Sequence, residues 1–298
     1  MSVGFVGIGA MGDPMVRQLL GAGHAVQVHD VRREAAAGVC ARGATWAASP
    51  RAVGNGAAVV FLSLPGPAEM EAVVLEPRQG LLAGMAADGV IVDTTTNAPS
   101  VTRRVAETCA ARGVVLLDAP VSQKPPAMTM MVGGPADVFQ AQQALLARVA
   151  RHLFYVGPSG SGSAAKLVSQ YLGYSNFMAA AEGLLIAAKA GVDLDVLARI
   201  IPVSAGASRM FEHFPRTVFN REFSSAGTLD IVAKDMRLAC DLAAELSAPA
   251  RIGGIVSEIM EQGRSQGLGG QGYANVVRVL EALAGAELAA GDAGHGGE

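Results

Sequence analysis

The opening of the chain constrains its fold more than any other stretch. A short apolar run ending at Val6 leads into a glycine-rich turn, and a helical pattern over residues 14–20 follows directly. A second apolar run, residues 25–28, is followed by an acid, Asp30. The turn has the spacing GxGxxG, with its glycines at Gly7, Gly9 and Gly12. This order of strand, glycine turn, helix and strand ending near an acid is typical of a dinucleotide-binding βαβ unit.

Each glycine of the turn has a separate physical role. Gly7 permits the sharp turn, Gly9 lets the backbone approach a pyrophosphate without an intervening side chain, and Gly12 lets the helix pack closely on the strand. The N-terminus of the helix then presents N–H groups and the positive end of its dipole to the phosphates. We therefore expect the whole turn to bind the cofactor, through Gly7, Ile8, Gly9, Ala10, Met11 and Gly12.

The residues after the second strand leave the choice of cofactor open. The carboxylate of Asp30 would accept hydrogen bonds from the ribose hydroxyls and repel a 2′-phosphate, which favours NAD. Arg32 and Arg33 would instead pair with that phosphate, which favours NADP, or lie in a solvated turn. We expect Asp30 and Arg32 to bind the cofactor, and we take NAD as the preferred cofactor with NADP as the alternative.

The first half of the chain alternates short apolar runs with helical patterns. The runs at residues 57–64, 89–93 and 113–117 are aliphatic without alternation, as in strands that are buried on both faces. Strands alternating with helices predict a parallel, doubly wound sheet. Ligands of such sheets lie beyond the carboxyl ends of the strands. Among the residues that follow the runs, we expect the cofactor to contact Leu64, Pro65 and Thr96.

After a last strand at residues 153–156, the second half has no convincing strand pattern. Helical patterns cover residues 164–190, 194–201, 226–246, 252–262 and 274–284. The expected fold is of the α/β class, with an N-terminal Rossmann domain (residues 1–161) followed by an all-α domain (residues 162–298). Core packing is expected for Met178 and for the Leu and Ile positions that follow it. The Gly-rich tail from Gly291 is expected to be disordered.

Composition limits the possible partners. A chain of 298 residues with 51% hydrophobic residues can bury two cores, and a net charge of −3 without any basic block gives no footprint for nucleic acid. No apolar tract is long enough to span a bilayer, and the first strand leaves no room for a secretory signal, so we expect a cytoplasmic protein. The cysteines are far apart and the histidines lack ligand spacing, which predicts no metal site.

Short motifs are spread in order over nearly the whole chain: GFVGIGAMGDPM, DTTTNAP, DAPVS, MVGGPAD, GPSGSGSAAKLVSQ and KDMRLA. In this order they resemble the 3-hydroxyisobutyrate (β-hydroxyacid) dehydrogenase family. The resemblance implies a homodimer or homotetramer that transfers a hydride between NAD(P) and a small 3-hydroxy acid, a related alcohol or the matching semialdehyde. It also implies Thr96 near the nicotinamide, Ser122 in substrate binding, Lys166 as the catalytic lysine and Lys234 on the cofactor side.

Hydride transfer from a carbinol carbon requires a group that removes the hydroxyl proton. Lys166 is the candidate, early in the helical pattern that follows the Gly/Ser break at residues 157–162. A free lysine, with a pKa of about 10.4, is a poor base near neutrality, but burial beside a positively charged nicotinamide would lower that pKa. Gln170 lies one turn later on the same face. The family usually has Asn there, and we expect Gln170 to assist Lys166 in catalysis.

The loop after Ser122 departs from the family. In the family, paired glycines cradle the substrate carboxylate with their N–H groups, whereas this chain has a shorter loop that reads Gln123, Lys124, Pro125, Pro126. Proline has no N–H to offer. Either Lys124 replaces those donors by charge, or the acid specificity is lost and a bulkier or neutral alcohol is accepted. We expect substrate contacts from Ser122, Gln123 and Lys124, and from Arg209 in a small polar stretch.

A salt bridge is not expected between Lys234 and Asp235, because neighbouring residues on a helix do not face each other. Two other functions stay open. Imine reductases that use NADPH resemble this architecture but tend to lack lysine at the catalytic position, so Lys166 argues against that class. A non-catalytic dinucleotide-binding module is the second alternative, since Gln170 and the loop after Ser122 depart from the family.

Overall fold

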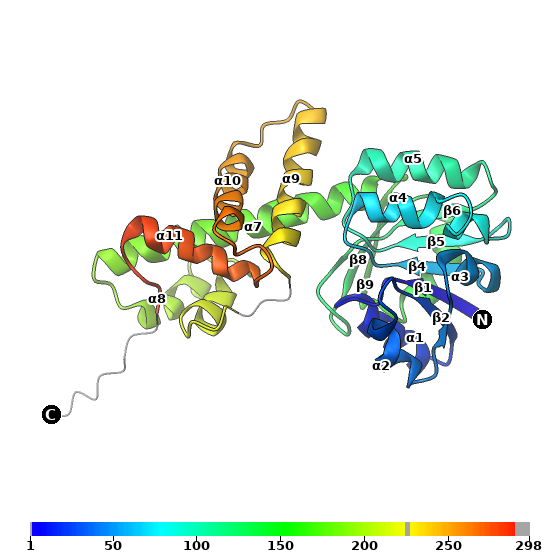
Figure 1. Cartoon of the computed structure of the whole chain (residues 1–298). Coiled ribbons are helices and arrows are strands. Elements are labelled where there is room, and N and C mark those ends of the chain that lie inside the picture. Colours follow the sequence, from blue (N-terminus) through cyan, green and yellow to red (C-terminus); the bar gives the residue numbers. More distant parts are fainter. Residues whose placement is uncertain (1, 224–226, 290–298) are drawn as a thin grey trace. The chain divides into compact units, whose positions relative to one another are not determined.

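The structure, a computed structural model, describes residues 2–223 and 227–289 (Figure 1). Backbone contacts divide the chain into two compact units, residues 1–166 and 167–298. The sequence pattern places the domain boundary at residue 161, where helix α7 (Ser161–Lys189) begins, whereas the division by contacts falls inside that helix. Ala226, the expected start of one helix, and the tail from Gly291 lie outside the described residues.

The first unit is built around one sheet, whose described strands pair in the order β3-β2-β1-β4-β5-β6-β8-β7, with β9 beside β8. The strands are Ser2–Val6 (β1), Ala25–His29 (β2), Thr45–Trp46 (β3), Val59–Leu62 (β4), Val90–Asp93 (β5), Val115–Asp118 (β6), Val121–Ser122 (β7), Thr129–Gly133 (β8) and His152–Gly157 (β9). The pairs from β3 to β6 are all parallel. The predicted doubly wound sheet is therefore confirmed, with its switch point between β1 and β4.

The sheet is not parallel throughout. Strand β8 runs antiparallel to both β6 and β7, and parallel to β9. The strand pattern missed β3, β7 and β8, because β3 and β7 have two residues each and β8 coincides with a glycine-containing motif. Ser122 is consequently a strand residue paired with Thr129, not a loop residue.

Helices cover both faces of the sheet. On one face lie α1 (Gly12–Gly21), α2 (Ala37–Cys40) and α6 (Ala136–Leu146); on the other lie α3 (Pro50–Gly56), α4 (Pro67–Leu75) and α5 (Pro99–Ala110). Figure 1 shows α4 and α5 on the side opposite α1 and α2. Within β4, Val59 and Phe61 pack in the core on the face of α1, α2 and α6, while Val60 and Leu62 pack in the core on the face of α3, α4 and α5. This double burial explains the purely apolar strand sequence. Short 3-10 turns occupy Arg33–Ala36 and Leu81–Ala83.

The second unit is helical. Besides the larger part of α7, it contains α8 (Leu194–Ile200), α9 (Leu229–Glu245), α10 (Arg251–Ser265) and α11 (Val277–Ala284), with short helical turns at Ile201–Val203, Phe211–His213, Phe214–Val218 and Tyr273–Val276. Residues 167–223 and 227–289 contain no strand, only an isolated bridge between Thr228 and Gly272. No helix of the described chain has the length and apolar composition needed to cross a membrane.

Aromatic side chains fill the core of this unit. Phe177 stacks on Phe214 with ring centroids 4.8 Å apart, and Tyr273 meets Phe177 edge-on at 5.2 Å. Met178 is buried in the same core, as expected. The expectation was wrong for Ile186, which is 71% exposed. It follows Leu185 by about 100° around the helix, which turns it away from the buried face.

Candidate functional site

The glycine turn has the geometry that a bound pyrophosphate needs. Gly7 has φ 95°, and a side chain there would overlap the carbonyl oxygen of Ser63. A side chain at Gly12 would overlap the carbonyl oxygen of Gly7. A Cβ placed on Gly9, by contrast, meets no atom within 4 Å. Gly7 and Gly12 thus serve the packing of the turn, while Gly9 leaves an open approach for a ligand.

Helix α1 begins directly after this turn, and its N-cap residue Met11 makes no side-chain cap. The first N–H groups of a helix lack partners within it and can bind an anion. In α1 the N–H of Asp13 donates to the carbonyl of Gly9 at 3.0 Å and Pro14 has no N–H, so an anion would bind to the N–H groups that precede them. The acid of this turn, Asp13, is bound by Arg17, whose Nε and Nη2 lie 2.6 and 3.0 Å from its carboxylate oxygens. That pairing reduces the repulsion of an anionic ligand. The expected phosphate-binding turn therefore fits a dinucleotide.

Both carboxylate oxygens of Asp30 accept backbone hydrogen bonds, and one of these bonds ties Asp30 to the glycine turn. Oδ2 accepts a hydrogen bond of 2.8 Å from the backbone N–H of Ile8, and Oδ1 accepts one of 2.9 Å from that of Arg32. The carboxylate is therefore held beside the turn, where a ribose would bind. The side chain of Arg32 is exposed.

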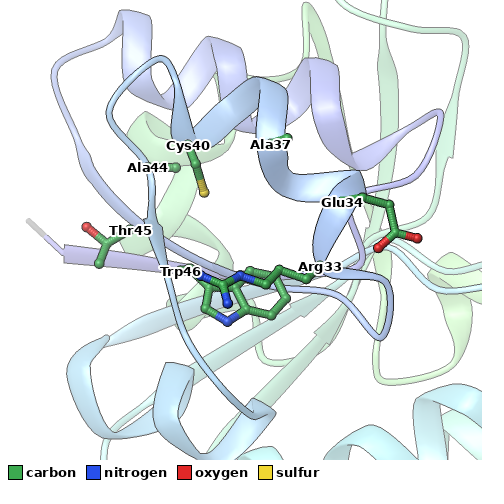
Figure 2. Close-up of a pocket in the computed structure, with 7 residues that line it drawn as sticks. All are labelled: Arg33, Glu34, Ala37, Cys40, Ala44, Thr45 and Trp46. Carbon is green, nitrogen blue, oxygen red and sulfur yellow. The ribbon is translucent and has the colours of Figure 1, made fainter.

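A cavity of about 720 Å³ lies between the segment after β2 and strand β3 (Figure 2). The guanidinium carbon of Arg33 lies over the Trp46 ring, 5.9 Å from its centroid. Figure 2 shows these two side chains together at one wall, with Cys40 on the helix that forms another. This contact places the guanidinium of Arg33 beside strand β3, to which Trp46 belongs.

The loops after β4 and β5 are joined by hydrogen bonds. Oγ1 of Thr95 accepts a bond of 3.1 Å from the backbone N–H of Leu64, and Oγ1 of Thr94 donates one of 2.6 Å to the carbonyl of Leu62. Two of the three threonines thus hold the loops together. Thr96 is half-buried and Pro65 is exposed at this edge.

Asp93, the last residue of β5, holds the threonine loop through hydrogen bonds to its carboxylate. Its Oδ1 accepts from the backbone N–H of Thr95 at 3.0 Å, and its Oδ2 from Nδ2 of Asn97 at 3.4 Å. Only 1% of its surface is exposed. Desolvation by burial raises the pKa of Asp93 to about 6, although these hydrogen bonds act in the opposite direction.

The expected substrate loop lies at the end of β7. Ser122 is half-buried, whereas Gln123 and Lys124 are exposed. Gln123 has φ 64°, and the backbone N–H of Ala127 closes a turn on the carbonyl of Lys124 at 3.1 Å. The loop therefore presents side chains and carbonyl oxygens, since its two prolines carry no N–H.

Lys166 lies early in α7, in the first unit, and is 7% exposed. The start of this helix is held by Asp118, the last residue of β6. Its Oδ1 accepts from the backbone N–H of Gly160 at 2.9 Å and its Oδ2 from that of Ser163 at 2.8 Å. Desolvation by burial raises the pKa of the Asp118 carboxyl.

A second group of polar residues lies in the helical unit. Nε2 of Gln170 lies 2.8 Å from Oδ2 of Asp235 and 2.7 Å from the hydroxyl oxygen of Tyr174. Burial raises the pKa of Tyr174 well above its usual value, and the charge of Asp235 adds to that shift. Contrary to the sequence-based expectation, Nζ of Lys234 pairs with Oδ1 of Asp235 at 2.8 Å. A lysine side chain is long and flexible enough to reach the carboxylate of its neighbour.

Arg209, the remaining predicted substrate residue, is exposed in the loop before Phe211–His213. The residue before it, Ser208, lines a cavity of about 550 Å³ in the helical unit, together with Asn176, Gly183, Ile201 and Phe211. The sequence motifs did not identify Asp93, Asp118 or Asp235 as the acceptors of these hydrogen bonds. Asp93 and Asp118 do share one signal, since each ends an otherwise apolar buried strand.

Metal ligands are not gathered anywhere in residues 2–223 and 227–289, where no group of three His, Cys, Asp or Glu side chains is placed to hold an ion. The glycine turn, the acid after β2 and the order of the parallel strands instead define the class: an NAD(P)-dependent oxidoreductase with a Rossmann unit and a helical unit. Residues 2–157 match the family model for the NAD binding domain of 6-phosphogluconate dehydrogenase. Residues 160–280 match that for NAD-binding of NADP-dependent 3-hydroxyisobutyrate dehydrogenase. The chain belongs to the 3-hydroxyisobutyrate dehydrogenase family.

Similar proteins cover almost all of the chain. The 2-(hydroxymethyl)glutarate dehydrogenase of Eubacterium barkeri is 31% identical over 297 residues, 98% of each chain. The 3-hydroxyisobutyrate dehydrogenase of Pseudomonas aeruginosa is 32% identical over 269 residues, 86% of this chain and 90% of its own. Among solved structures, Mycobacterium tuberculosis 3-hydroxyisobutyrate dehydrogenase with L-serine has a TM-score of 0.86 at 25% identity, over 94% of this chain and 98% of its own.

Several imine reductases share the fold at lower similarity. That of Streptomyces aurantiacus is 20% identical with a TM-score of 0.63, over 94% of this chain and 99% of its own. At this identity the likeness shows the architecture alone.

Proposed function

We propose that the protein oxidises a small 3-hydroxy acid or related alcohol, or reduces the corresponding semialdehyde, with Lys166 as the general acid and base. The observation that carries this proposal is the buried position of Lys166, 7% exposed, on a helix whose start is hydrogen-bonded to the carboxyl end of β6. Ligands of doubly wound sheets bind beyond that edge of the strands.

The dinucleotide, when bound, supplies the acceptor or donor of the hydride. In oxidation, Nζ of Lys166 accepts the proton of the substrate hydroxyl while the hydrogen on the carbinol carbon leaves as a hydride, and the carbonyl forms. In reduction, the same Nζ donates its proton to the carbonyl oxygen. The burial of Lys166 keeps its amine out of bulk water.

We assign pyrophosphate binding to the turn from Gly7 to Gly12, and ribose binding to Asp30. Leu64, Pro65 and Thr96 would line the path of the cofactor along the strand ends, and Lys234 would face its nicotinamide end. NAD is the proposed preference, because both oxygens of Asp30 are held beside the turn while Arg33 is drawn to Trp46.

Substrate recognition is assigned to Ser122, Gln123, Lys124 and Arg209, with Gln170 as a partner of Lys166. Lys124 and Arg209 are exposed cations suited to a carboxylate. The alternative, a neutral or bulkier alcohol, follows from the two prolines that replace backbone donors in the loop.

A substrate screen with both cofactors tests the proposal. The panel contains short 3-hydroxy acids, hydroxy amino acids and neutral or aryl alcohols. Activity confined to short acids would support a carboxylate site rebuilt on side chains, and Lys124→Ala should then raise KM for acids but not for a neutral aldehyde. Activity confined to neutral alcohols would contradict the acid substrate.

Lys166→Ala should abolish turnover and leave dinucleotide affinity largely intact. The matched control is Lys189→Ala, in the last turn of the same helix, whose exposed amine bonds only the carbonyl of Ala284 at 2.7 Å among the hydrogen bonds of the described chain. Turnover retained by Lys166→Ala would remove the acid/base role. Faster NADPH oxidation with a cyclic imine would favour an imine reductase, and dinucleotide binding without any turnover would favour a non-catalytic module.

We also propose that the chain assembles as a homodimer or homotetramer in the cytoplasm. Support comes from large apolar side chains on the helical unit: Ile186 and Leu283 are 71% and 75% exposed, and Ile252 and Ile255, on one face of α10, are 61% and 60% exposed. Light scattering after gel filtration tests the assembly, since a monomer at micromolar concentration would contradict it. Cell fractionation tests the location.

A further inference from the structure

We propose that Asp118 is a positioning residue for the reaction: its carboxylate sets where helix α7 begins and thereby where the amine of Lys166 is presented. This inference rests on the proposed role of Lys166. It concerns contacts within the first unit alone.

The carboxylate of Asp118 replaces an absent helix cap. The first N–H groups of a helix have no partner within it and are usually satisfied by a side chain just before the helix. The residue before α7 is Gly160, which has no side chain. Asp118 supplies both oxygens from a strand more than forty residues earlier, to the N–H of Gly160 and to that of Ser163. A carboxylate at this end is also favoured by the helix dipole.

The first turn of α7 is pressed closely against the sheet around this carboxylate. A Cβ on Gly162 would lie 2.6 Å from the carbonyl oxygen of Met131 and would overlap the carbonyl oxygen of Asp118. A Cβ on Gly133 would lie 2.6 Å from Oδ1 of Asp118 and 2.8 Å from the nitrogen of Gly162. The absence of two side chains lets the helix reach the buried acid.

A further hydrogen bond holds the same turn from another element. Oγ of Ser163 lies 3.0 Å from Oγ1 of Thr102, which belongs to α5. Asp118, Ser163 and Thr102 are all completely buried. The turn is therefore fixed to β6 and to α5.

Lys166 follows Ser163 by three residues, less than one helical turn. Because the helix is rigid over this distance, a displacement of its first turn moves the lysine with it. A misplacement of about 1 Å of a group in the reaction can lower the rate on the order of a hundredfold. Asp118 touches neither the reacting carbon nor its oxygen in this proposal; it acts through Lys166.

Asp118→Asn tests the proposal, because it keeps the shape of the side chain and turns one acceptor into a donor that faces a backbone N–H. We expect kcat to fall about a hundredfold, KM for the substrate and Kd for NAD to change less than about threefold, and the primary isotope effect on kcat with C-deuterated substrate to rise. A cap with a merely structural role would lower the melting temperature without raising the isotope effect.

The matched control is Asp193→Asn in the second unit. Asp193 is likewise a helix-capping aspartate that accepts from two backbone N–H groups, those of Asp195 and Val196 at the start of α8. This control should leave kcat and the isotope effect unchanged.

Rescue with a small amine separates the inference from the proposed function. If Asp118 acts through Lys166, the rate of Lys166→Ala restored by added ethylamine should be the same with and without Asp118→Asn. An inactive Lys166→Ala combined with a fully active, folded Asp118→Asn would overturn this inference alone. A fully active Lys166→Ala would overturn the proposed function itself.

Asp118→Glu carries the test if Asp118→Asn does not fold. It keeps the charge but displaces the carboxylate by one methylene, so a positioning role predicts a lower kcat with Kd for NAD retained. An unchanged kcat in this variant would overturn the inference.

Discussion

Nε2 of Gln170 donates to Oδ2 of Asp235 at 2.8 Å and lies 2.7 Å from the hydroxyl oxygen of Tyr174. A carboxylate only accepts hydrogen bonds, so the nitrogen of the amide must face Asp235. The amide nitrogen has two hydrogens, and these two contacts account for both. Gln170 therefore has its carbonyl oxygen, an acceptor, left to offer to a bound molecule.

Asp235→Asn should destabilise the helical unit by about 3 kcal/mol, because it removes the charge that pairs with the partly buried amine of Lys234 and keeps one acceptor oxygen where Lys234 and Gln170 now use two. Urea denaturation followed by circular dichroism measures the change. Asp230→Asn on the same helix is the control. It breaks an exposed pair with Arg264 at 2.7 Å, and should lower the unfolding free energy by less than about 1 kcal/mol. Equal losses in the two variants would contradict the structural importance of the Asp235 group.

Asp30→Ala should shift the protein away from NAD. The change removes an acceptor for the ribose hydroxyl and the charge that repels a 2′-phosphate. We expect the ratio of kcat/KM for NAD to that for NADP to fall about tenfold or more. Arg33→Ala should change this ratio less than about threefold, since the guanidinium is held over Trp46. A wild-type preference for NADP, measured in steady-state assays, would show that the reading of Asp30 is wrong.

Two alanine substitutions in the glycine turn should have different effects. Gly9→Ala should leave the melting temperature nearly unchanged, because its Cβ would meet no atom, but raise Kd for the dinucleotide about tenfold. Gly12→Ala should lower the unfolding free energy by about 1–3 kcal/mol, because its Cβ would overlap the carbonyl oxygen of Gly7. Calorimetric melting and titration of NAD distinguish the two. Tight binding by Gly9→Ala would argue against pyrophosphate at this turn.

The buried carboxyl of Asp93 should make stability depend on pH. Its pKa is raised to about 6, above an ordinary value near 3.9, so the folded state binds the proton more tightly than the unfolded state. Acidification through this range therefore stabilises the fold through Asp93, by about 1 kcal/mol between pH 7 and pH 5 and by about 3 kcal/mol in full. The gain is lost as the pH rises through 6.

Comparison of wild type with Asp93→Asn at each pH isolates this contribution. Asp118 acts in the same direction as Asp93, because burial raises its pKa too. Glu76 acts in the opposite direction: backbone hydrogen bonds, first that from Gln79, lower its pKa, so its stabilisation is lost on acidification. On going from pH 7 to pH 5, the urea midpoint of Asp93→Asn should rise less, or fall more, than that of wild type. Parallel behaviour of the two proteins would contradict the raised pKa of Asp93.

Much of the first unit could be predicted because its signals are local. The spacing of Gly7, Gly9 and Gly12 specifies a turn, and strands buried on both faces are apolar along their length, as β4 is throughout and β5 is up to its last residue, Asp93. Strand β8 carries no such signal, because its residues Thr129–Gly133 coincide with a glycine motif. Its pairing, antiparallel to β7 and parallel to β9, depends on how the sheet is assembled. A pattern of residue types does not record which edge a strand joins.

The candidate site was less predictable for a different reason. Lys166 and Gln170 were found through motifs. Asp118, which accepts hydrogen bonds at the start of their helix, and Asp235, which accepts one from Gln170, have partners far away in the sequence. Asp118 reaches Gly160 across 42 residues, and Asp235 reaches Gln170 across 65. Even the adjacent pair of Lys234 and Asp235 was misjudged, since helical spacing describes the direction of Cβ atoms and not the reach of a flexible lysine.

The sequence by itself determined the dinucleotide-binding turn, the alternation of strands and helices, the helical second unit and the family. These follow from backbone geometry and burial, which act on neighbouring residues and leave a periodic pattern. Only the tertiary structure decided which buried carboxylate satisfies which backbone N–H, as Asp118 does at the start of α7. The donors that a buried carboxylate accepts from depend on which distant segments pack against it, and a local sequence pattern does not record that packing.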